Sequence, residues 1–401
     1  MLAALDPNRP DQALAVLAAG PRAIDCPGLG SGRLVFPRYR EVRQLLRDPR
    51  FLCGPIARGM LEELPVELRA LLGPVALWIL YADPPLHSRL RGVMAKAFTA
   101  RHISALQESI AEEADTLVAC FMRADGGDAV AELADPLPVH TISVLMGLES
   151  LASAPLKAWS DDVVLLTEPK LSAEEQVRLA VAWRGLSEFF LELIESRRRS
   201  PDSDIVSAMV HAEADGVRLT KEELVANCIA LLVGGHETTS SLLSSVVLAA
   251  FEQRDARDRV LHDSVYAAGF VEETLRLYGP SKITARTAAC DVEVGCERVR
   301  AGQRLILLQA SANRDGEAFS NPAAFLPERS PNLHVGFGFG AHACFGAALA
   351  RMQAIAFLRS FMAAIDSFEL DASQVTWKAS QVLRTPARIP VQVAAPHRSH
   401  K

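Results

Sequence analysis

Apolar residues recur at three- and four-residue spacing along most of the chain, a pattern that predicts a mainly helical protein. The expected helices cover residues 36–50, 87–121 (as two helices that meet near residue 100), 139–146, 155–166, 173–198, 204–212, 224–251 and 267–277, and another follows residue 346. Short runs of β-type residues at 284–287, 292–294, 305–308 and within 375–393, with Gly295 and Gly302 at turns, predict short strands. The stretch between residues 51 and 83 is rich in glycine and proline, and we expect loops there. The expected fold class is therefore mainly α, a large helical domain with small β-sheets.

No internal repeat, low-complexity tract or linker divides the chain of 401 residues. The length alone allows two or three domains, but without a linker we expect one domain over residues 1–401. Hydrophobic residues make up 49% of the chain and charged residues 22%. This balance excludes a disordered chain and supports a large buried core.

Charge and cysteine usage exclude several classes of protein. The net charge is −6, whereas a nucleic-acid-binding protein usually carries a basic surplus, so no nucleic-acid partner is expected. The seven cysteines contain no CxxC pair, which argues against a disulfide scaffold and a zinc ribbon. The N-terminus has no basic segment before an apolar run, and the long apolar stretch 224–251 is interrupted by Gly-Gly-His-Glu-Thr-Thr. We therefore expect a cytoplasmic protein without a membrane span.

The segment 337–346, Phe-Gly-Phe-Gly-Ala-His-Ala-Cys-Phe-Gly, carries the clearest chemistry. Its glycines allow a backbone to approach a flat ligand closely, and Cys344 precedes a predicted helix. A helix N-terminus favours the thiolate, the form of cysteine that binds metals. On this segment alone, a glycine-rich turn with an inert buried cysteine is an equally good interpretation.

A second polar segment, Gly234-Gly235-His236-Glu237-Thr238-Thr239, lies at the centre of the long apolar helix. Gly234 and Thr238 are four residues apart and share one helix face, where the missing side chain leaves room for a small ligand beside the hydroxyl. The Thr238 hydroxyl can also bond back to the carbonyl of Gly234. For His236 we expect packing or hydrogen bonding.

These two segments together resemble those of the cytochrome P450 family. The family's haem loop reads F-x-x-G-x-[HR]-x-C-x-G and matches Phe337, Gly340, His342, Cys344 and Gly346, and its oxygen-activation motif [AG]-G-x-[DE]-T matches 234–238. The resemblance implies the P450 fold enclosing haem b (iron protoporphyrin IX), with Cys344 as the metal ligand and Gly338 within the loop. It also assigns oxygen activation to Thr238 and proton delivery to Glu237. A thiolate ligand pushes electron density onto the iron and favours cleavage of the O–O bond.

The family's E-x-x-R motif is matched by Glu273 and Arg276, one helical turn apart. At this spacing a surface pair is common and contributes only about 0.2–0.5 kcal/mol. In the family the pair is buried beneath the haem loop and joined by a second arginine, for which Arg329 is the candidate. The resemblance thus gives these three residues a structural role.

Haem also brings two propionate carboxylates, which need cationic partners inside a protein. His87 and Arg91 match the family's H-x-x-x-R pair and share a helix face, and Arg286 and His342 complete the expected clamp. A solvated charge is the alternative for each residue alone, but four residues at family positions favour the clamp.

Substrate selectivity is expected from three regions, residues 54–81, 165–178 and 281–285. The candidate pocket residues are Trp78, Ile79, Lys282, Ile283 and Thr284. Core packing is an equal alternative for Trp78 and Ile79, and an amine extended to solvent is the alternative for Lys282.

The expected activity is a haem-thiolate monooxygenase that inserts one oxygen atom of O₂ into a lipophilic small molecule, by hydroxylation or epoxidation. The resemblance points to a secondary metabolite as substrate and to ferredoxin and ferredoxin reductase as electron donors for a monomeric enzyme. A basic rim of Arg89, Lys96, Arg101 and Arg351 is the expected docking surface. The alternatives are a peroxide-driven peroxygenase, whose relatives usually lack the acid–alcohol pair, and a non-catalytic haem-binding protein, which would not need Thr238.

Overall fold

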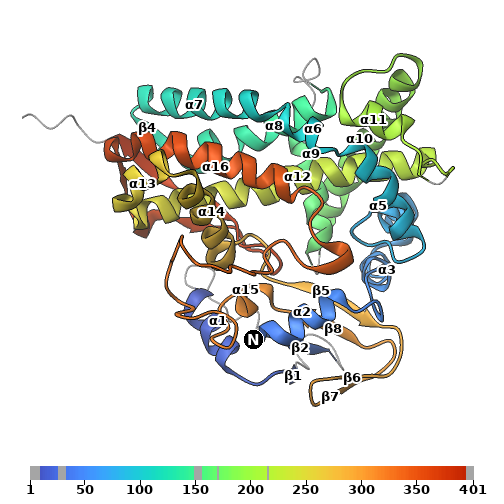
Figure 1. Ribbon diagram of the computed structural model, residues 1–401. Helices are drawn as coiled ribbons and strands as arrows, with labels where there is room; N and C mark the ends of the chain where they lie inside the picture. The colour runs from blue at the N-terminus through green and yellow to red at the C-terminus, as the bar shows by residue number, and fades with distance from the viewer. Residues whose placement is uncertain (1–9, 26–32, 149–155, 169–170, 215, 394–401) are drawn as a thin grey trace, which may run out of the picture.

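The computed structural model describes residues 10–25, 33–148, 156–168, 171–214 and 216–393. Long helices fill one part of the molecule, and a β-sheet with short helices forms the other (Figure 1). The α-helices are α1 (Pro10–Ala19), α2 (Tyr39–Arg47), α3 (Gly54–Glu62), α4 (Val66–Leu72), α5 (Leu86–Ala97), α6 (Ala100–Ser104), α7 (Gln107–Arg123), α8 (Pro136–Met146), α9 (Leu156–Val164), α10 (Ala173–Arg199), α11 (Ile205–His211), α12 (Lys221–Glu252), α13 (Arg257–His262), α14 (Ser264–Tyr278), α15 (Gln309–Ala312) and α16 (Ala347–Ala364). A π-helix, η4 (Val130–Ala134), precedes α8, and short 3₁₀ helices include η3 (Gly73–Leu77), η6 (Leu165–Thr167) and η8 (Gly340–His342). The mainly α fold class expected from the sequence is confirmed.

The region predicted as loops between residues 51 and 83 is the main error of the sequence-based prediction. It folds as α3, α4 and η3. Pro55 lies in the first turn of α3, where a missing backbone N–H costs nothing because the first N–H groups of a helix have no intrahelical partner. Proline therefore marks a helix start here and not a loop.

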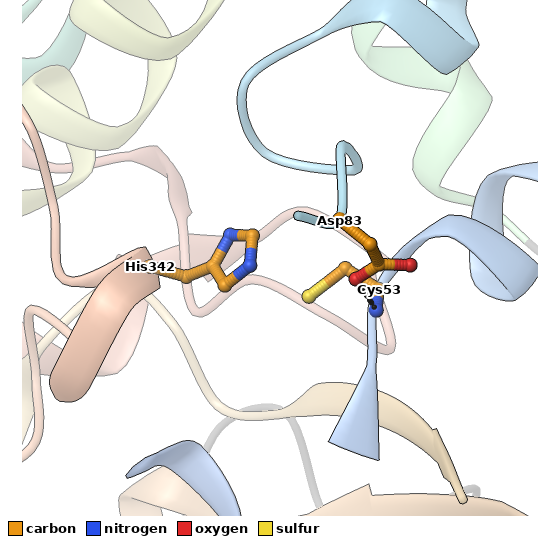
Figure 2. A group of neighbouring side chains, drawn as sticks. All are labelled: Cys53, Asp83 and His342. Carbon is orange, nitrogen blue, oxygen red and sulfur yellow. Dashed lines mark hydrogen bonds between the residues drawn. The ribbon is translucent and has the colours of Figure 1, made fainter. Parts of the chain in front are cut away.

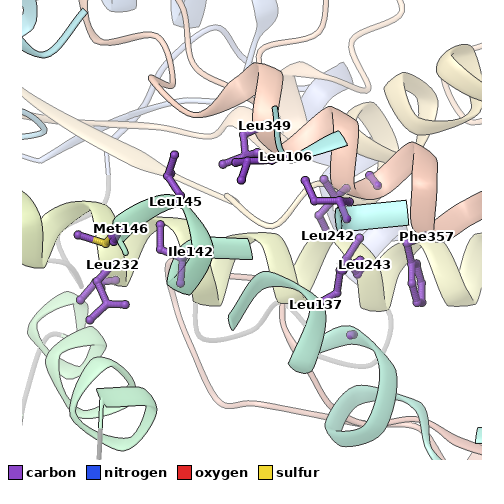
Figure 3. Close-up of a cluster of buried hydrophobic side chains, with 14 of the residues drawn as sticks. Leu106, Leu137, Ile142, Leu145, Met146, Leu232, Leu242, Leu243, Leu349 and Phe357 are labelled. Atoms are coloured by element: carbon purple, nitrogen blue, oxygen red, sulfur yellow. The ribbon is translucent and has the colours of Figure 1, made fainter. Parts of the chain in front are cut away.

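Helix α12 forms the centre of the molecule. It begins with a capping box, in which the Thr220 side chain accepts the N–H of Glu223 and the Glu223 side chain accepts the N–H of Thr220. Leu232, Leu242 and Leu243 of α12 pack among apolar side chains of α8 and α16, shown in Figure 3. Helices from distant parts of the chain therefore share one core with the segment that carries Gly234–Thr238.

The larger sheet has the strand order β1-β2-β8-β5-β3. Its strands are β1 (Ile24–Asp25), β2 (Leu34–Phe36), β3 (Phe51–Leu52), β5 (Thr284–Ala288) and β8 (Arg304–Leu307). Strand β2 pairs with β8 in parallel, and the other neighbours are antiparallel, with Arg286 opposite Leu305. The remaining strands form small sheets: β4 (Gly126–Asp128), β12 (Pro390–Val393) and β9 (Phe368–Leu370); β6 (Val292–Val294) and β7 (Glu297–Val299); β10 (Thr376–Trp377) and β11 (Pro386–Arg388).

Among the described residues, one segment, Ala347–Ser367, is long and apolar enough by length and composition to cross a membrane. Half of its most apolar window is buried inside the protein. Leu349, Phe357 and Phe361 of this segment belong to the main core. The apolar character of α16 is therefore explained by its packing as a core helix.

Candidate active site

The loop before α16 depends on two glycines with a left-handed backbone. Gly338 has φ +71° and Gly340 has φ +76°, values that residues with a side chain rarely adopt. A Cβ atom on Gly340 would lie 2.8 Å from the carbonyl oxygen of Leu46 at the end of α2. The loop can pack this closely against α2 only with glycine at this position.

Cys344 lies immediately after this turn. Its backbone N–H donates to the carbonyl of Phe337 at 2.8 Å, and Gly346 forms the N-cap of α16. The Cys344 side chain is exposed, yet burial by the surrounding protein raises the pKa of its thiol, while the N–H of Gly346 and the charges of Arg351 and Arg91 lower it. A thiol that is accessible and at the same time surrounded by protein faces a hollow of the molecule.

The N–H of Gly346 at the helix start lowers the pKa of the Cys344 thiol, as expected, but the larger effect of burial raises it above its ordinary value. Coordination to a metal would supply the missing stabilisation, because a coordinated thiol is deprotonated.

Beneath the loop, Glu273 and Arg276 are fully buried and paired at 2.7 Å. Arg329 donates to the same carboxylate at 3.0 Å. The Arg276 guanidinium also donates to the carbonyls of Asn313, Pro322 and Ala324. The three candidate structural residues thus lie together, and the pair is a buried network and not the weak surface pair that its spacing alone suggests.

On α12, the Thr238 hydroxyl donates to the carbonyl of Gly234 at 2.6 Å, as expected from their spacing. A Cβ atom on Gly234 would meet nothing within 4 Å, whereas one on Gly235 would lie 3.0 Å from Ile142. Open space therefore lies beside the Thr238 side of the helix, and α8 covers the Gly235 side.

Glu237 is buried and pairs with Lys378 at 2.9 Å. The Lys378 side chain is 46% exposed, so the pair connects a buried carboxylate to the surface. Sequence reasoning missed Lys378, because 141 residues separate it from Glu237 and no local motif marks it.

His236 is buried, and neither of its ring nitrogens has a hydrogen-bond partner. Its Nδ1 lies 3.6 Å from a carboxylate oxygen of Asp161 on α9. Burial lowers the pKa of His236, and the Asp161 charge opposes this shift. Of the two expected roles, packing agrees with this burial, and the ring makes no hydrogen bond within the described residues.

Four candidate cationic residues surround the Cys344 loop. The rings of His87 and His342 lie 4.1 Å apart, and Arg91 donates to the carbonyl of Ala343 at 3.1 Å. Arg286 is buried and donates only to Thr284 and Ala285 within its own strand. In the described part of the chain, none of the four forms an ion pair with a carboxylate.

The electrostatics of this cluster match an anionic ligand. Burial, together with the charges of His87, Arg286 and Arg91, lowers the pKa of His342 to about 3. Buried nitrogens without a partner, His87 Nε2 and His342 Nδ1, remain available as well. Buried polar atoms are normally satisfied, so this cluster fits the two carboxylates of a haem.

The side chain of His342 points toward Cys53 and Asp83 (Figure 2). One ligand atom from each of these three residues lies within 4.8 Å of the others, a spacing that could hold a metal ion. However, the two Asp83 oxygens already accept the N–H groups of Cys53 and Gly54, both at 2.8 Å. We therefore interpret Asp83 as a cap that fixes the turn before α3.

The candidate pocket residues Trp78 and Ile79 have different surroundings. Trp78 is buried and stacks on Trp183 and Tyr81, with ring centroids 6.1 and 6.2 Å away. It belongs to the main core, which agrees with the core-packing alternative, and a pocket role for Trp78 stays a prediction. Ile79 is partly buried against the same core, and its N–H donates to Asn227 at 2.9 Å.

Around β5, Ile283 packs with Val35, Ile306 and Leu308 in a small cluster on the sheet. Ile283 is only partly buried there, and its place in the substrate pocket stays a prediction. Thr284 accepts a hydrogen bond from Arg286 at 3.3 Å. The Lys282 ammonium donates to the carbonyl of Ser380 at 2.5 Å and is not extended into solvent. Burial lowers the pKa of Lys282.

Two of the four residues of the expected basic rim are paired with carboxylates. Arg89 pairs with Glu223, and Arg351 pairs with Glu272 at 2.6 Å. Lys96 donates to the carbonyl of Glu213 at 2.7 Å. Within the described residues, Arg101 is exposed and its guanidinium forms no ion pair. Carboxylates of neighbouring helices thus compensate two of the four charges of the expected rim, and its role as a docking surface stays a prediction.

A cysteine facing a hollow, a cationic cluster without carboxylate partners and a Gly–Thr helix segment beside open space define a haem-thiolate protein. The comparisons agree with this class. The Cytochrome P450 family model matches residues 164–391. Nocardicin C N-oxygenase of Nocardia uniformis is 36% identical over 88% of each chain. Cyclomarin C epoxidase CymV of Salinispora arenicola is 33% identical over 79% of each chain. The chain belongs to the cytochrome P450 family.

Solved structures place this chain among bacterial P450 enzymes. The structure of P450BioI in complex with an acyl carrier protein carrying a hexadecenoic acid superposes with a TM-score of 0.88. It is 27% identical and covers 97% of this chain and 99% of that chain. The protein is a cytochrome P450 monooxygenase whose cofactor is haem b.

Proposed function

We propose that this cytochrome P450 inserts one oxygen atom of O₂ into a lipophilic secondary metabolite, with electrons from ferredoxin and ferredoxin reductase. The observation that carries the proposal is the open space at Gly234 beside the Thr238 hydroxyl. Two similar P450 enzymes named above act on nocardicin C and cyclomarin C. The largely apolar interior around α12 suits a lipophilic substrate.

In this proposal, Cys344 provides the thiolate ligand of the haem iron. His87, Arg91, Arg286 and His342 hold the propionate carboxylates. Phe337, Gly338 and Gly346 shape the loop that carries the thiol. When bound, the haem supplies the chemistry of O₂ activation.

Two side chains of α12 carry a proton or place a hydroxyl group at the open space. Thr238 holds a hydroxyl beside the open space, and its bond to the Gly234 carbonyl fixes the direction of that hydroxyl. Glu237 is the proton carrier, since Lys378 connects its carboxylate with the solvent-exposed surface. Glu273, Arg276 and Arg329 keep the Cys344 loop in place without taking part in the chemistry.

We further propose a monomeric, cytoplasmic enzyme made of one domain over residues 1–401. The long helices and the sheet part pack together in the described residues, and α16 is accounted for as a core helix. These features support the proposal.

The spectrum of the reduced carbon monoxide complex tests the haem ligation. Wild-type protein is expected to show the thiolate-type band, and Cys344→Ala is expected to lose it, because no other sulfur replaces the ligand. Cys53→Ala is a matched control that removes a nearby buried thiol and keeps the band. A thiolate-type band that persists in Cys344→Ala would contradict the assignment.

A further inference from the structure

Lys282, just before β5, lies against the segment that joins β10 to β11. Its backbone N–H donates to the carbonyl of Val382 at 2.9 Å. The neighbouring residue Ser281 pairs with Leu383 in an antiparallel β-bridge. We call residues 378–385 the β10–β11 loop. The place of Lys282 in the molecule therefore follows from the place of this loop.

The β10–β11 loop contacts α12 at two positions that flank Thr238 in sequence. Its first residue, Lys378, pairs with Glu237 at 2.9 Å. Near its end, the carbonyl of Arg384 accepts a hydrogen bond from the Ser241 hydroxyl. The loop therefore joins the segment before β5 to the turn of α12 whose Thr238 hydroxyl lies beside open space.

A second segment comes close to Lys282 at this point. Glu168 directly follows η6, and its charge raises the pKa of Lys282. The two side chains form no ion pair in the described part of the chain. Two of the three regions from which substrate selectivity is expected, 165–178 and 281–285, therefore approach each other here.

The Lys282 ammonium carries a charge that no carboxylate of the described residues pairs with. It donates one hydrogen bond, to the carbonyl of Ser380 at 2.5 Å, so two of its three N–H groups have no acceptor among these residues. Burial and the charge of Arg384 lower its pKa. Removing a charge from water is costly unless an opposite charge compensates it. The surroundings of Lys282 therefore favour an anionic ligand.

The other described lysines have partners that Lys282 lacks. Lys157, Lys221 and Lys378 each pair with a carboxylate. Lys96 donates to a backbone carbonyl, as Lys282 does, but it is exposed and water can satisfy it. Lys282 is thus the one lysine of the described residues that is partly buried and has no carboxylate partner.

We propose that Lys282 binds the carboxylate of a lipophilic acid whose apolar part extends toward the open space beside Thr238. This inference rests on the proposed function and deepens it by naming the substrate class. A carboxylate accepts charge-assisted hydrogen bonds from the N–H groups of the ammonium that have no acceptor. The apolar interior around α12 suits the rest of the molecule. A neutral ester or alcohol would leave the buried charge uncompensated.

The test measures the Kd of the holoenzyme for two matched pairs of probes, from the shift of the haem from low to high spin. The pairs are dodecanoic acid with methyl dodecanoate and dehydroabietic acid with methyl dehydroabietate. Within each pair only the charge and one methyl group differ, and both acids are ionised near neutral pH.

The variants separate the charge of Lys282 from its packing. Lys282→Met removes the charge and keeps a chain of similar length, and Lys282→Arg keeps the charge. The matched control is Lys221→Met, which removes a lysine charge at the start of α12. Lys221 lies about 20 Å along the helix from Gly234.

Wild-type protein is expected to bind at least one acid about tenfold or more tightly than its ester, because a hydrogen bond between charged groups is stronger than a neutral one. Lys282→Met is expected to weaken binding of that acid by about tenfold and to leave the Kd of the ester nearly unchanged. Lys282→Arg and Lys221→Met are expected to keep the preference for the acid.

Two outcomes would overturn the inference. If Lys282→Met weakens binding of acid and ester equally, Lys282 only holds the β10–β11 loop in place. If the wild-type protein binds neither acid more tightly than its ester, Lys282 does not select a carboxylate, and this result needs no variant.

The carbon monoxide spectrum distinguishes failure of this inference from failure of the proposed function. Wild-type protein that shows the thiolate-type band but no preference for an acid would leave the proposed function standing. Wild-type protein that lacks the band would contradict the proposed function itself.

Discussion

At the scale of single residues, Glu237 and Thr238 are neighbours in sequence but have different partners. The Glu237 carboxylate is held by Lys378 toward the surface, and the Thr238 hydroxyl is held by the Gly234 carbonyl beside open space. Adjacent positions of one helix thus carry a carboxylate that is paired toward the surface and a hydroxyl that faces the open space. Such a division suits controlled proton delivery, since efficient general acid catalysis needs a positioned donor.

Thr238→Ala is expected to lower O₂-dependent product formation by about 10²-fold, because it removes a positioned hydroxyl. Peroxide-driven turnover is expected to change much less. The measurement is product formed per O₂ consumed, with ferredoxin and reductase as donors. Thr239→Ala, at the buried neighbouring position, is the control for disturbance of the helix.

Equal O₂-dependent turnover in wild type and Thr238→Ala would contradict the role of the hydroxyl. Absence of any turnover in the wild type, despite bound haem, would indicate a non-catalytic haem protein. Turnover that is driven by peroxide and indifferent to ferredoxin would indicate a peroxygenase.

Whether the role of a residue can be predicted from the sequence depends on how far from its partners it lies along the chain. Cys344, Thr238 and the Glu273–Arg276 pair lie in short segments whose chemistry is readable locally, and the structure places the pair and the Thr238 hydroxyl as expected. Lys378 reaches Glu237 across 141 residues and leaves no sequence signal. Trp78 cannot be assigned to core or pocket by composition, because apolar residues line both.

At the scale of elements, the contact between α2 and η8 sets the position of the haem loop. Gly340 opens η8 with a left-handed backbone, and a Cβ atom added to it would lie 2.8 Å from the Leu46 carbonyl oxygen. Gly302 has a similar φ of +79° in the turn before β8, but a Cβ there would meet nothing within 4 Å. Substitutions at these two glycines can therefore be compared to distinguish the cost of backbone strain from the cost of steric crowding.

Gly340→Ala is expected to destabilise the protein by more than Gly302→Ala and to accelerate haem loss. Both changes carry the strain of a left-handed alanine, about 1–2 kcal/mol, but only Gly340→Ala pushes the loop away from α2. The measurement is the unfolding midpoint together with the rate of haem transfer to an acceptor protein. Equal effects in the two variants would show that the α2 contact does not hold the loop.

Long periodic helices are predictable from the sequence, and short ones are not. Helices α10 and α12 lie within a few residues of their expected bounds, because a long apolar period is a strong signal. Helices α3 and α4 are not predicted, because glycine and proline at a helix start are also typical of loops. Helix α13 is not predicted either, because most of its residues are charged and Val260 is its one buried residue.

At the scale of the whole molecule, His236 joins the central helix to α9 through a buried contact with Asp161. Burial lowers the pKa of His236, and Lys157 also lowers it, while Asp161, Asp135 and Glu237 oppose the shift. The folded protein therefore holds this ring neutral, whereas the unfolded chain takes up a proton below the ordinary value of about 6.5. Because the unfolded state binds more protons, stability falls as the pH decreases below that value.

His236→Leu is expected to flatten the loss of stability between about pH 6.5 and 5, since one such group contributes at most about 1.4 kcal/mol per pH unit. The measurement is the thermal unfolding midpoint as a function of pH, for holoenzyme and variant side by side. Asp161→Asn removes the carboxylate that opposes the shift, so it is expected to keep or steepen the slope. A His236→Leu variant with the wild-type slope would contradict this origin of acid sensitivity.

The buried network of Glu273, Arg276 and Arg329 separates support of the thiol loop from the residues proposed to hold the propionates. The Glu273 carboxylate and the carbonyls of Asn313, Pro322 and Ala324 accept the hydrogen bonds of Arg276. Within the described residues, Arg91 and Arg286 form no ion pair with this network or with another carboxylate. A substitution in one of the two sets therefore leaves the protein contacts of the other set in place.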